Sequence, residues 1–397
     1  MRAAAILLLL LRAMAAATSM PLQDPLRQPG WDHFYNNEFE DALRDFSNEV
    51  HQHPFDPQAY NHVAQALLYL EMFRNGALES QLVTGNNPFL RRAKMEVPGD
   101  TKAKFNDALQ TAVRLAEAEL QKDPKSISAL YALSVSHGLR SNYLFLVEKN
   151  WTEALRDATA SRKYSNRILA IDQNFIDAYL VQGLHDYIVG SLPFYMRMLG
   201  FVAGFHGDRE LGISEVKRVA DHGVLNKYDA RILLAVIYRR EHRPQDALPL
   251  LIDASAKFPR NYLFRLEEVQ MYSDLGNKQK ALEILDEVDR LRAAGAPGYQ
   301  GIPAGKIEYL RGNLLFWYTD LDKALENMKR ATDSAQVLEL NTAVLAWLRL
   351  GQIYDLKSEH SQAIPAYRQA MQLAPQSDAA AEAKGYISSP YRRRPRY

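Results

Sequence analysis

The chain has 397 residues, of which 47% are hydrophobic and 24% are charged, and it contains no cysteine. This composition is typical of a globular protein with a sizeable core, and it excludes disulfides, thiolate metal sites and a catalytic thiol. The 48 basic residues are balanced by 47 acidic residues, which leaves a formal charge of +1. A chain so close to neutral lacks the long-range field that concentrates nucleic acid, so we expect no nucleic-acid partner.

Residues 1–17 have the pattern of a secretory signal peptide. Arg2 supplies a positive charge, an apolar run follows over 3–11, and small residues occupy most of 13–17. The run is about half as long as a membrane-spanning helix, so we expect no transmembrane span. Arg12, a charge between the apolar run and the small residues, is unusual for a cleaved signal. The pattern nevertheless predicts export to a periplasm or to the outside of the cell, which suits a chain without cysteine.

One arrangement of residues recurs along the chain. Its clearest copy has large residues at helical spacing, then a small–large–small pattern and a final proline: Trp347, Leu350, Gly351, Tyr354, Ala363, Tyr367, Ala370 and Pro375. A second copy repeats that spacing: Leu234, Ala235, Tyr238, Ala247, Leu251, Ala254 and Pro259. Partial copies comprise Tyr272, Ala281, Leu285 and Val288, then Gly312, Leu315, Ala324, Met328 and Ala331, and finally Ala42, Phe46 and Pro54. The pattern predicts pairs of antiparallel helices, with Ala or Gly where the two backbones approach most closely and a large residue beside them.

These copies resemble tetratricopeptide (TPR) repeats, and the copy at 344–377 matches the family pattern almost completely. The resemblance implies an all-α fold, a right-handed α-solenoid of about seven stacked helix pairs, because one pair cannot bury its apolar face alone. We expect degenerate TPR units over 28–189 and clearer C-terminal TPR units over 228–377. A cap helix and a basic tail should follow over 378–397, with the tail disordered from Ser388 onward.

Residues 190–227 interrupt the repeats with a Gly-rich helical insertion. The pattern predicts a helix that ends near Gly190, a short apolar helix over 194–205, and a helix to His222 with Asp208 as its N-cap. This segment resembles the central part of the eukaryotic inclusion-body-clearance TPR family and of a group of exported bacterial TPR proteins. Neither resemblance implies a defined reaction.

Three aromatic residues of the insertion, Phe194, Phe201 and Phe205, allow two interpretations. Apolar residues at helical spacing are usually buried, which favours a helix that plugs a junction between two stacks of repeats. An exposed apolar ridge that meets a protein partner or lipid is the alternative.

The sequence contains none of the common catalytic motifs. It has no Gly-rich phosphate loop, no Gly-x-Ser-x-Gly elbow and no His-Glu-x-x-His pair. His51 and His53 are close in sequence but would point about 200° apart on a helix, so we expect no metal there. We therefore predict no enzymatic activity and no cofactor. An enzyme would need a cluster of titratable groups near the insertion, for which the candidates are His185, Asp186, His206 and Asp208.

First-helix side chains line the concave surface of TPR proteins, where a peptide or a partner helix is generally held. The best-known subtype clamps C-terminal carboxylates of chaperones with Lys and Asn at set groove positions. At two of these positions the three clearest units of this chain have Ile232 and Val236, Leu266 and Gln270, and Leu348 and Gln352. This departure argues against a chaperone tail and favours an apolar peptide, a helix or a lipid-like ligand. Arg239 and Arg240 are the candidate fixed cations.

The sequence therefore predicts an exported, non-enzymatic TPR scaffold that binds a protein or peptide partner in an envelope assembly. Its candidate partner-binding residues are Ile232, Val236, Arg239, Arg240, Leu266, Gln270, Phe194, Phe201 and Phe205. The alternative is a TPR component that binds a lipid or small molecule for a transport system. That alternative rests on the apolar insertion and on the supply of 21 Tyr and 15 Phe.

Overall fold

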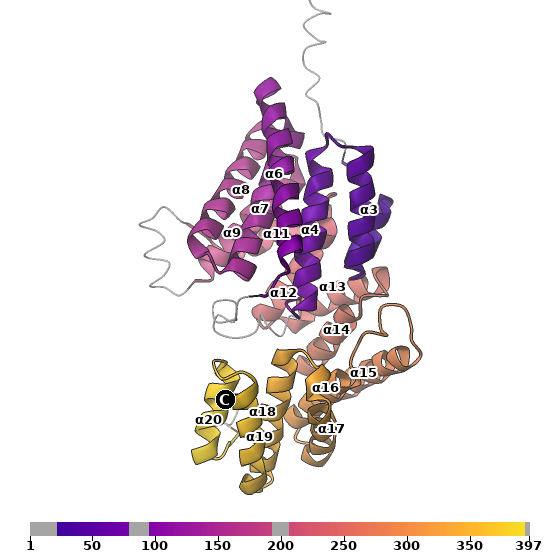
Figure 1. Ribbon diagram of the computed structural model, residues 1–397, viewed down its shortest axis with the longest axis vertical. Helices are drawn as coiled ribbons and strands as arrows, with labels where there is room; N and C mark the ends of the chain where they lie inside the picture. The colour runs from indigo at the N-terminus through magenta and orange to yellow at the C-terminus, as the bar shows by residue number, and fades with distance from the viewer. Residues whose placement is uncertain (1–21, 79–94, 193–205, 394–397) are drawn as a thin grey trace, which may run out of the picture. The chain divides into compact units, whose positions relative to one another are not determined.

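The structure is a computed structural model that describes residues 22–78, 95–192 and 206–393 (Figure 1). Regular structure in these residues is helical throughout, with no strand among them, which confirms the all-α class. The predicted signal peptide at 1–17 lies outside the described residues, and so do Phe194, Phe201 and Phe205. None of the described helices combines the length and the apolarity that are needed to cross a membrane.

The described residues separate into two compact units. Unit 1 holds residues 22–34, 38–71 and 95–234, and unit 2 holds 35–37, 72–78 and 235–393. Up to residue 222, the described residues form a 3-10 turn η1 (Pro25–Arg27), α2 (Pro29–Tyr35), α3 (Phe39–Gln52), α4 (Pro57–Arg74), α6 (Gly99–Lys122), α7 (Ile127–Tyr143), the π-helical turn η3 (Leu144–Glu148), α8 (Trp151–Ile171), the 3-10 turn η4 (Ile176–Ala178), α9 (Tyr179–Gly190) and α11 (Arg209–His222).

The remaining described helices are also joined by short connections. They are α12 (Lys227–Arg240), α13 (Pro244–Lys257), α14 (Tyr262–Asp274), α15 (Lys278–Ala293), α16 (Ala304–Trp317), α17 (Leu321–Asp333), the 3-10 turn η5 (Ala335–Val337), α18 (Leu340–Leu356), α19 (His360–Leu373) and α20 (Asp378–Ser388). Consecutive helices pack as hairpins, for example α16 with α17 and α18 with α19 (Figure 1). The expected solenoid of helix pairs is therefore confirmed.

Burial in the second helices follows the repeated sequence pattern. The small residue at the start of the small–large–small pattern has no exposed surface in any of five copies: Ala42, Ala247, Ala281, Ala324 and Ala363. The large residue four positions later is buried in each copy: Phe46, Leu251, Leu285, Met328 and Tyr367. A spacing of four places both residues on one face of the second helix, so that face is the one that packs on its partner.

Polar side chains at the helix starts explain where several helices begin. The side-chain oxygens of Ser126, Asn150, Asp208, Asn277 and Ser377 each accept a hydrogen bond from a backbone N–H in the first turn of the following helix. Such caps satisfy donors that would otherwise lack a partner, and each contributes about 1 kcal/mol. The structure thus confirms Asp208 as an N-cap, and α9 ends at Gly190 as expected.

Small residues hold the helices of unit 1 close together. Between α7 and α8, the Ser134 hydroxyl lies 2.9 Å from the Ser165 hydroxyl and donates to the carbonyl oxygen of Ser161 over 3.0 Å. Between α9 and α11 the contact is backbone on backbone, because a Cβ at Gly212 would lie 2.4 Å from the Tyr187 nitrogen. Glycine is therefore required at 212 by the approach of two helices and not by a turn.

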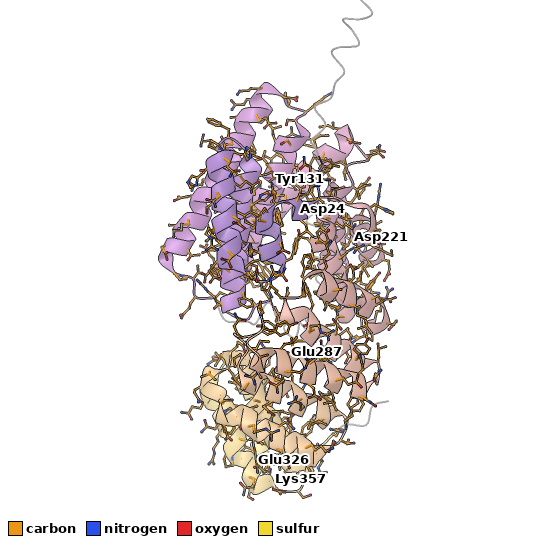
Figure 2. All side chains as sticks on the ribbon, turned by 90° about the vertical axis from the view of Figure 1, so that its right-hand side faces the viewer. Asp24, Tyr131, Asp221, Glu287, Glu326 and Lys357 are labelled. Carbon is orange, nitrogen blue, oxygen red and sulfur yellow. The ribbon has the colours of Figure 1, made fainter. Side chains whose placement is uncertain are left out.

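Two tyrosine hydroxyls tie distant segments of unit 1 to one another. Tyr131 of α7 donates to the side-chain oxygen of Asn226 over 2.9 Å (Figure 2). Tyr228, at the start of α12, donates to the carboxylate of Asp24 over 3.1 Å. Asp177 also accepts from the backbone nitrogen of Asn226 over 2.7 Å, so the loop before α12 is held from several sides.

Helix α20 and the residues after it close unit 2. The expected cap helix corresponds to α20, which extends to Ser388. The expectation of a disordered tail from Ser388 is wrong for the described residues, because the backbone nitrogen of Tyr391 donates to Asp355 over 2.7 Å. Composition indicated a solvated segment, but a buried carboxylate on α18 provides a specific acceptor for it.

Candidate functional site

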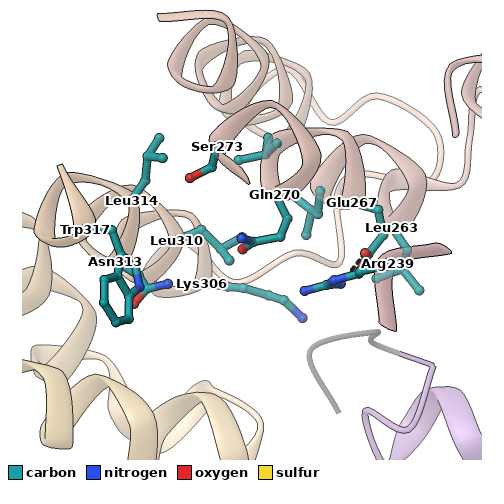
Figure 3. A pocket seen from close by; sticks show the side chains of 12 residues that line it. Arg239, Leu263, Glu267, Gln270, Ser273, Lys306, Leu310, Asn313, Leu314 and Trp317 are labelled. Carbon is teal, nitrogen blue, oxygen red and sulfur yellow. Dashed lines mark hydrogen bonds and ion pairs between the residues drawn. The ribbon is translucent and has the colours of Figure 1, made fainter. Parts of the chain in front are cut away.

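A pocket in unit 2 combines side chains of three successive first helices (Figure 3). Helix α12 contributes one residue, and α14 and α16 contribute the rest at helical spacing. The lining residues are Arg239, then Leu263, Leu266, Glu267, Val269, Gln270 and Ser273, then Lys306, Leu310, Asn313, Leu314 and Trp317. Side chains three, four and seven positions apart share one face of a helix, so α14 and α16 each present a single face to the pocket.

Arg239 forms one charged wall of the pocket. Only 8% of this residue is exposed, and its guanidinium pairs with the carboxylate of Glu267. The Nε atom of Arg239 is buried and has no hydrogen-bond partner among the described residues. Because a buried donor without a partner costs about 1–3 kcal/mol, this guanidinium is under-satisfied in the free protein.

Lys306 supplies a second cation, which extends toward Arg239 across the pocket (Figure 3). Its Nζ lies 2.8 Å from an oxygen of Glu339, and the residue is 2% exposed. The same nitrogen lies 5.9 Å from the centre of the Tyr262 ring. Both cations are therefore held by carboxylates, and the pocket carries fixed charges of both signs with little net charge.

The apolar part of the pocket ends at Trp317, which is 43% exposed. The guanidinium of Arg349 lies 4.9 Å from the centre of this indole and 4.1 Å from the Phe316 ring. A cation over an aromatic face fixes its orientation. Trp317 is therefore a partly exposed aromatic residue whose ring is held in place by Arg349. Tryptophan is among the residue types that most often dominate the binding energy of protein interfaces.

Two amide side chains provide hydrogen-bonding groups between the charged and the apolar parts. Gln270 donates to Asp274 over 2.8 Å, which leaves its carbonyl oxygen as an acceptor. The side-chain oxygen of Asn313 is buried and has no hydrogen-bond partner among the described residues. A ligand with both a donor and an apolar group would satisfy this part of the pocket.

The cavity within the pocket measures about 30 Å³, the space of about two water molecules. This volume does not enclose a metabolite or a lipid chain, which need several hundred cubic ångströms. It suits a surface depression that receives one side chain of a larger molecule.

The structure brings together three of the predicted partner-binding residues, Arg239, Leu266 and Gln270. Val236 and Arg240 lie on the same helix as Arg239 but do not line this pocket, and Ile232 belongs to unit 1. The three residues that meet belong to α14 and to the last turn of α12, and their role in partner binding stays a prediction.

Sequence reasoning missed the side of the pocket that α16 forms. The predicted groove positions belong to the three clearest repeat copies, and the copy that contains Gly312 and Leu315 is only a partial one. The signal was nevertheless present, because Lys306, Leu310, Asn313 and Trp317 are spaced by four, three and four residues. That spacing is the one expected for a single helix face.

A cluster of titratable groups does lie near the predicted insertion, in unit 1. His185 Nδ1 is 3.5 Å from Asp186 Oδ1, and an Arg162 nitrogen is 3.7 Å from the same oxygen. Burial, followed by the charge of Asp186, raises the pKa of Glu215 to about 7. Burial lowers the pKa of His185. Of the four residues suggested for an enzyme, Asp208 is instead engaged by the first turn of α11, where it accepts from the Leu211 nitrogen over 3.0 Å.

Three potential metal ligands meet between α2 and α3. One ligand atom each of His33, Glu38 and Asp41 lies within 4.8 Å of the others. His33 is already hydrogen-bonded to Glu38 over 2.6 Å, and Asp41 pairs with Arg44. These mutual contacts account for the arrangement, so we assign no metal to it.

Comparisons with known proteins bear on the repeats. Sequence profiles of the tetratricopeptide repeat match residues 30–70, 206–296 and 344–377. No curated protein matches the chain in sequence. Among solved structures, the human IFIT1 dimer with PPP-AAAA is 15% identical over 85% of this chain and 69% of its own, with a TM-score of 0.44.

Two further solved structures match this chain. Yeast Tom70 is 14% identical over 92% of this chain and 88% of its own, with a TM-score of 0.39. A tetratricopeptide repeat protein from Parabacteroides merdae is 14% identical over 79% of this chain and 98% of its own, with a TM-score of 0.31.

Proposed function

Because the chain is a tetratricopeptide repeat protein, we propose that it is a non-enzymatic scaffold that binds a protein partner through the pocket between α14 and α16. The observation that carries the proposal is the convergence of side chains from α12, α14 and α16 on that pocket. In a stack of helix pairs, the first helices form one continuous face across which an extended peptide or a helix can lie.

The dimensions of the pocket favour a protein over a lipid or a small metabolite. A cavity of about 30 Å³ accepts part of one side chain, whereas a lipid would need an enclosed apolar cavity. The lipid-binding alternative rests on the apolar insertion and on the supply of Tyr and Phe, and the insertion's Phe194, Phe201 and Phe205 lie outside the described residues. A peptide with one apolar side chain would place that side chain against Leu266 and Trp317, which form the apolar part of the pocket.

Polar groups around the pocket would set the orientation of such a peptide. The Asn313 oxygen and the Arg239 Nε have no hydrogen-bond partner among the described residues, so a backbone amide and a backbone carbonyl of the partner would complement them. The ion pairs of Arg239 with Glu267 and of Lys306 with Glu339 stay formed. We expect them to position the apolar wall and to contribute little net attraction, because buried pairs offset their own desolvation cost.

Site-directed photocrosslinking tests this assignment. A photoreactive benzoylphenylalanine replaces Gln270 in the pocket, or Ile252 as the control, an exposed residue of the second helix α13. After capture from the native source, we expect one protein partner to crosslink from position 270 and not from 252. Equal crosslinking from both positions, or from neither, would contradict the proposal.

A matched pair of tryptophan variants measures how much the pocket contributes. Trp317→Ala should weaken partner binding by about 2 kcal/mol, or about 30-fold, because an aromatic anchor is lost. Trp151→Ala is the control, since Trp151 is 38% exposed but belongs to α8 in unit 1. Equal binding by the two variants would count against the pocket.

The proposed scaffold works outside the cytoplasm, in an envelope assembly. The support is the pattern of residues 1–17, a positive start, an apolar run and small residues. N-terminal sequencing of protein isolated from fractionated native cells is the test. A mature terminus near residue 18 in the exported fraction is expected, and an intact terminus in the cytoplasmic fraction would refute export.

A further inference from the structure

The residues that follow α20 lie against the first helices of unit 2. Ser389 has extended backbone angles, φ −136° and ψ 96°. Two residues later, the Tyr391 nitrogen donates to Asp355 Oδ2 of α18 over 2.7 Å. Arg393 then donates from Nη2 to the carbonyl oxygen of Phe316, in the last turn of α16, over 2.5 Å. We call residues 389–393 the docked strand.

Alternation along the docked strand separates an inward from an outward face. Successive residues of an extended chain point to opposite sides, and Tyr391 and Arg393 are both half-buried whereas Arg392 between them is exposed. The Tyr391 ring lies 6.2 Å from the Phe316 ring and 5.3 Å from the Tyr386 ring. The Arg393 guanidinium lies 4.8 Å from the Phe316 ring. Recognition therefore uses an aromatic residue and an arginine two positions apart.

Asp355 is the acceptor that fixes the register of the docked strand. Its carboxylate is fully buried and receives the Tyr367 hydroxyl at 2.6 Å and His360 Nδ1 at 2.6 Å, in addition to the Tyr391 nitrogen. A buried carboxylate needs such donors, because the loss of one costs about 1–3 kcal/mol. Any segment that replaces the docked strand must therefore bring a backbone N–H to this position.

The docked strand and the pocket meet at the end of α16. Phe316 contacts the strand, and the next residue, Trp317, lines the pocket. Arg349 of α18 lies over both rings, at 4.1 Å from Phe316 and 4.9 Å from Trp317. The two binding regions are thus joined through one pair of aromatic residues and one shared guanidinium.

We propose that the docked strand occupies a second peptide subsite next to the pocket, and that the partner binds by displacing it with an extended segment of aromatic–x–arginine sequence. This inference rests on the proposed function, since it names the chemistry of the partner segment that continues past Trp317. The chain's own strand shows which groups fit: a backbone donor for Asp355, an aromatic ring for Phe316 and Tyr386, and a guanidinium for the Phe316 carbonyl.

The docked strand is held by the hydrogen bonds and ring contacts of Tyr391 and Arg393, and it competes with the partner as a tethered segment. A tethered segment with a short linker has an effective concentration in the millimolar range. A partner segment with the same contacts, and with an additional anchor in the pocket, would therefore compete at micromolar concentration. Once the docked strand has left, the free subsite should bind the same sequence when it is supplied as a separate peptide.

The test uses the full chain and a fluorescent peptide with the sequence of residues 388–393, Ser-Ser-Pro-Tyr-Arg-Arg. Tyr391→Ala/Arg393→Ala should vacate the subsite, whereas Tyr391 and Arg393 stay in place in the control Arg392→Ala. We expect the peptide to bind the double variant at least about tenfold more tightly than the wild type or the control, by fluorescence anisotropy. A peptide in which the first Arg is replaced by Ala should bind equally well, and one in which the second is replaced should not.

Equal peptide binding by the double variant, the control and the wild type would overturn the proposal, and so would loss of discrimination between the two substituted peptides. Matching circular dichroism spectra and one cooperative unfolding transition in each protein exclude a folding defect, although the double variant should melt at a lower temperature because Asp355 loses a donor. Crosslinking of the partner from position 270 is read separately. If that crosslink persists while the peptide fails to bind, the subsite is refuted and the pocket is retained.

Discussion

The ring of Tyr367 on α19 occupies the space where a side chain at Gly351 on α18 would lie. A Cβ at position 351 would be 2.4 Å from Tyr367 Cε1 and 2.7 Å from its Cδ1. The two helices of this repeat approach closely because glycine and a fully buried tyrosine face one another. This contact is the structural basis of the Gly–Tyr pair in the clearest repeat copy.

Gly351→Ala should therefore destabilise unit 2, even though alanine is the better helix former. The methyl group must displace a packed ring, and such overpacking costs about 1–3 kcal/mol. Gly385→Ala is the matched control, because nothing lies within 4 Å of a Cβ at 385 in α20. That control should stabilise by up to about 1 kcal/mol. Urea unfolding followed by circular dichroism distinguishes the two, and equal shifts would contradict the packing argument.

Gly212→Ala should cost more than Gly351→Ala, about 3 kcal/mol or above, because the obstacle is backbone. A Cβ at 212 would lie 2.4 Å from the Tyr187 nitrogen and 2.6 Å from the Gly183 carbonyl oxygen. A side chain can rotate away from an added methyl group, whereas two helix backbones can make room for it only if the whole helices move apart. Two measurements test this: the melting temperature of the protein, and the hydrogen-exchange protection of the α9 and α11 amides, which reports on unit 1. A variant that melts like the wild type would show that the helices are less closely packed.

Glu215 should make unit 1 less stable as the pH rises toward neutrality. Burial and the neighbouring Asp186 raise its pKa from 4.5 to about 7, while Arg162 and Arg218 act in the opposite direction. The folded state then binds a proton that the unfolded state releases, so this stabilisation is complete below pH 4.5 and is lost as pH rises through about 7. Glu215→Gln should remove that slope and be more stable than the wild type at pH 8. Parallel pH profiles for the two proteins would disprove the shift.

His360 should stabilise the packing of the end of α20 more strongly at low pH, when its ring is protonated, than at high pH. Its Nδ1 faces Asp355 and its Nε2 lies 3.2 Å from the carbonyl oxygen of Ile387. The hydrogen bond to Asp355, and then the one to Ile387, raise the pKa of His360 above 6.5. The contribution is therefore complete below pH 6.5 and is lost as the pH rises through the raised pKa.

The titration of His360 can be followed by NMR of its ring protons, together with hydrogen exchange of the Tyr391 amide. Protection of that amide, which is the measured exchange rate compared with the intrinsic rate at the same pH, should fall at pH values above the observed midpoint. His360→Asn removes the charge and should abolish this pH dependence. A midpoint at or below 6.5 would contradict the two-acceptor geometry.

The repeat pattern made much of the fold predictable. Ala281 and Ala363 were expected where helices approach, and both have no exposed surface. Gly190, Asp208 and His222 mark helix ends as expected, because turn and capping preferences act within a few residues. The TPR resemblance, and not periodicity alone, singled out Leu266 and Gln270, which the structure places on one pocket.

Contacts between residues far apart in sequence could not be predicted. Arg239 was expected as a fixed cation, but its partner Glu267 lies 28 residues away on another helix. The docked strand depends on Asp355, which lies 36 residues before Tyr391. The composition of the tail itself does not indicate that this acceptor is nearby. Gly212 belongs to the Gly-rich segment that was expected to interrupt the repeats, whereas the structure uses it for a close helix contact. Such pairings arise from tertiary packing, which a local pattern does not encode.

The close approach of Gly190 and Arg209 has a consequence for how this protein can change during evolution. A Cβ at Gly190 would lie 2.4 Å from the Arg209 nitrogen, so the end of α9 and the beginning of α11 meet. The two ends of the connection between α9 and α11 therefore lie at nearly one point. Each doubling of such a connection adds only about 0.6 kcal/mol of closure entropy. Insertions between α9 and α11, even whole domains, can therefore be acquired or lost while the hairpin itself keeps its packing.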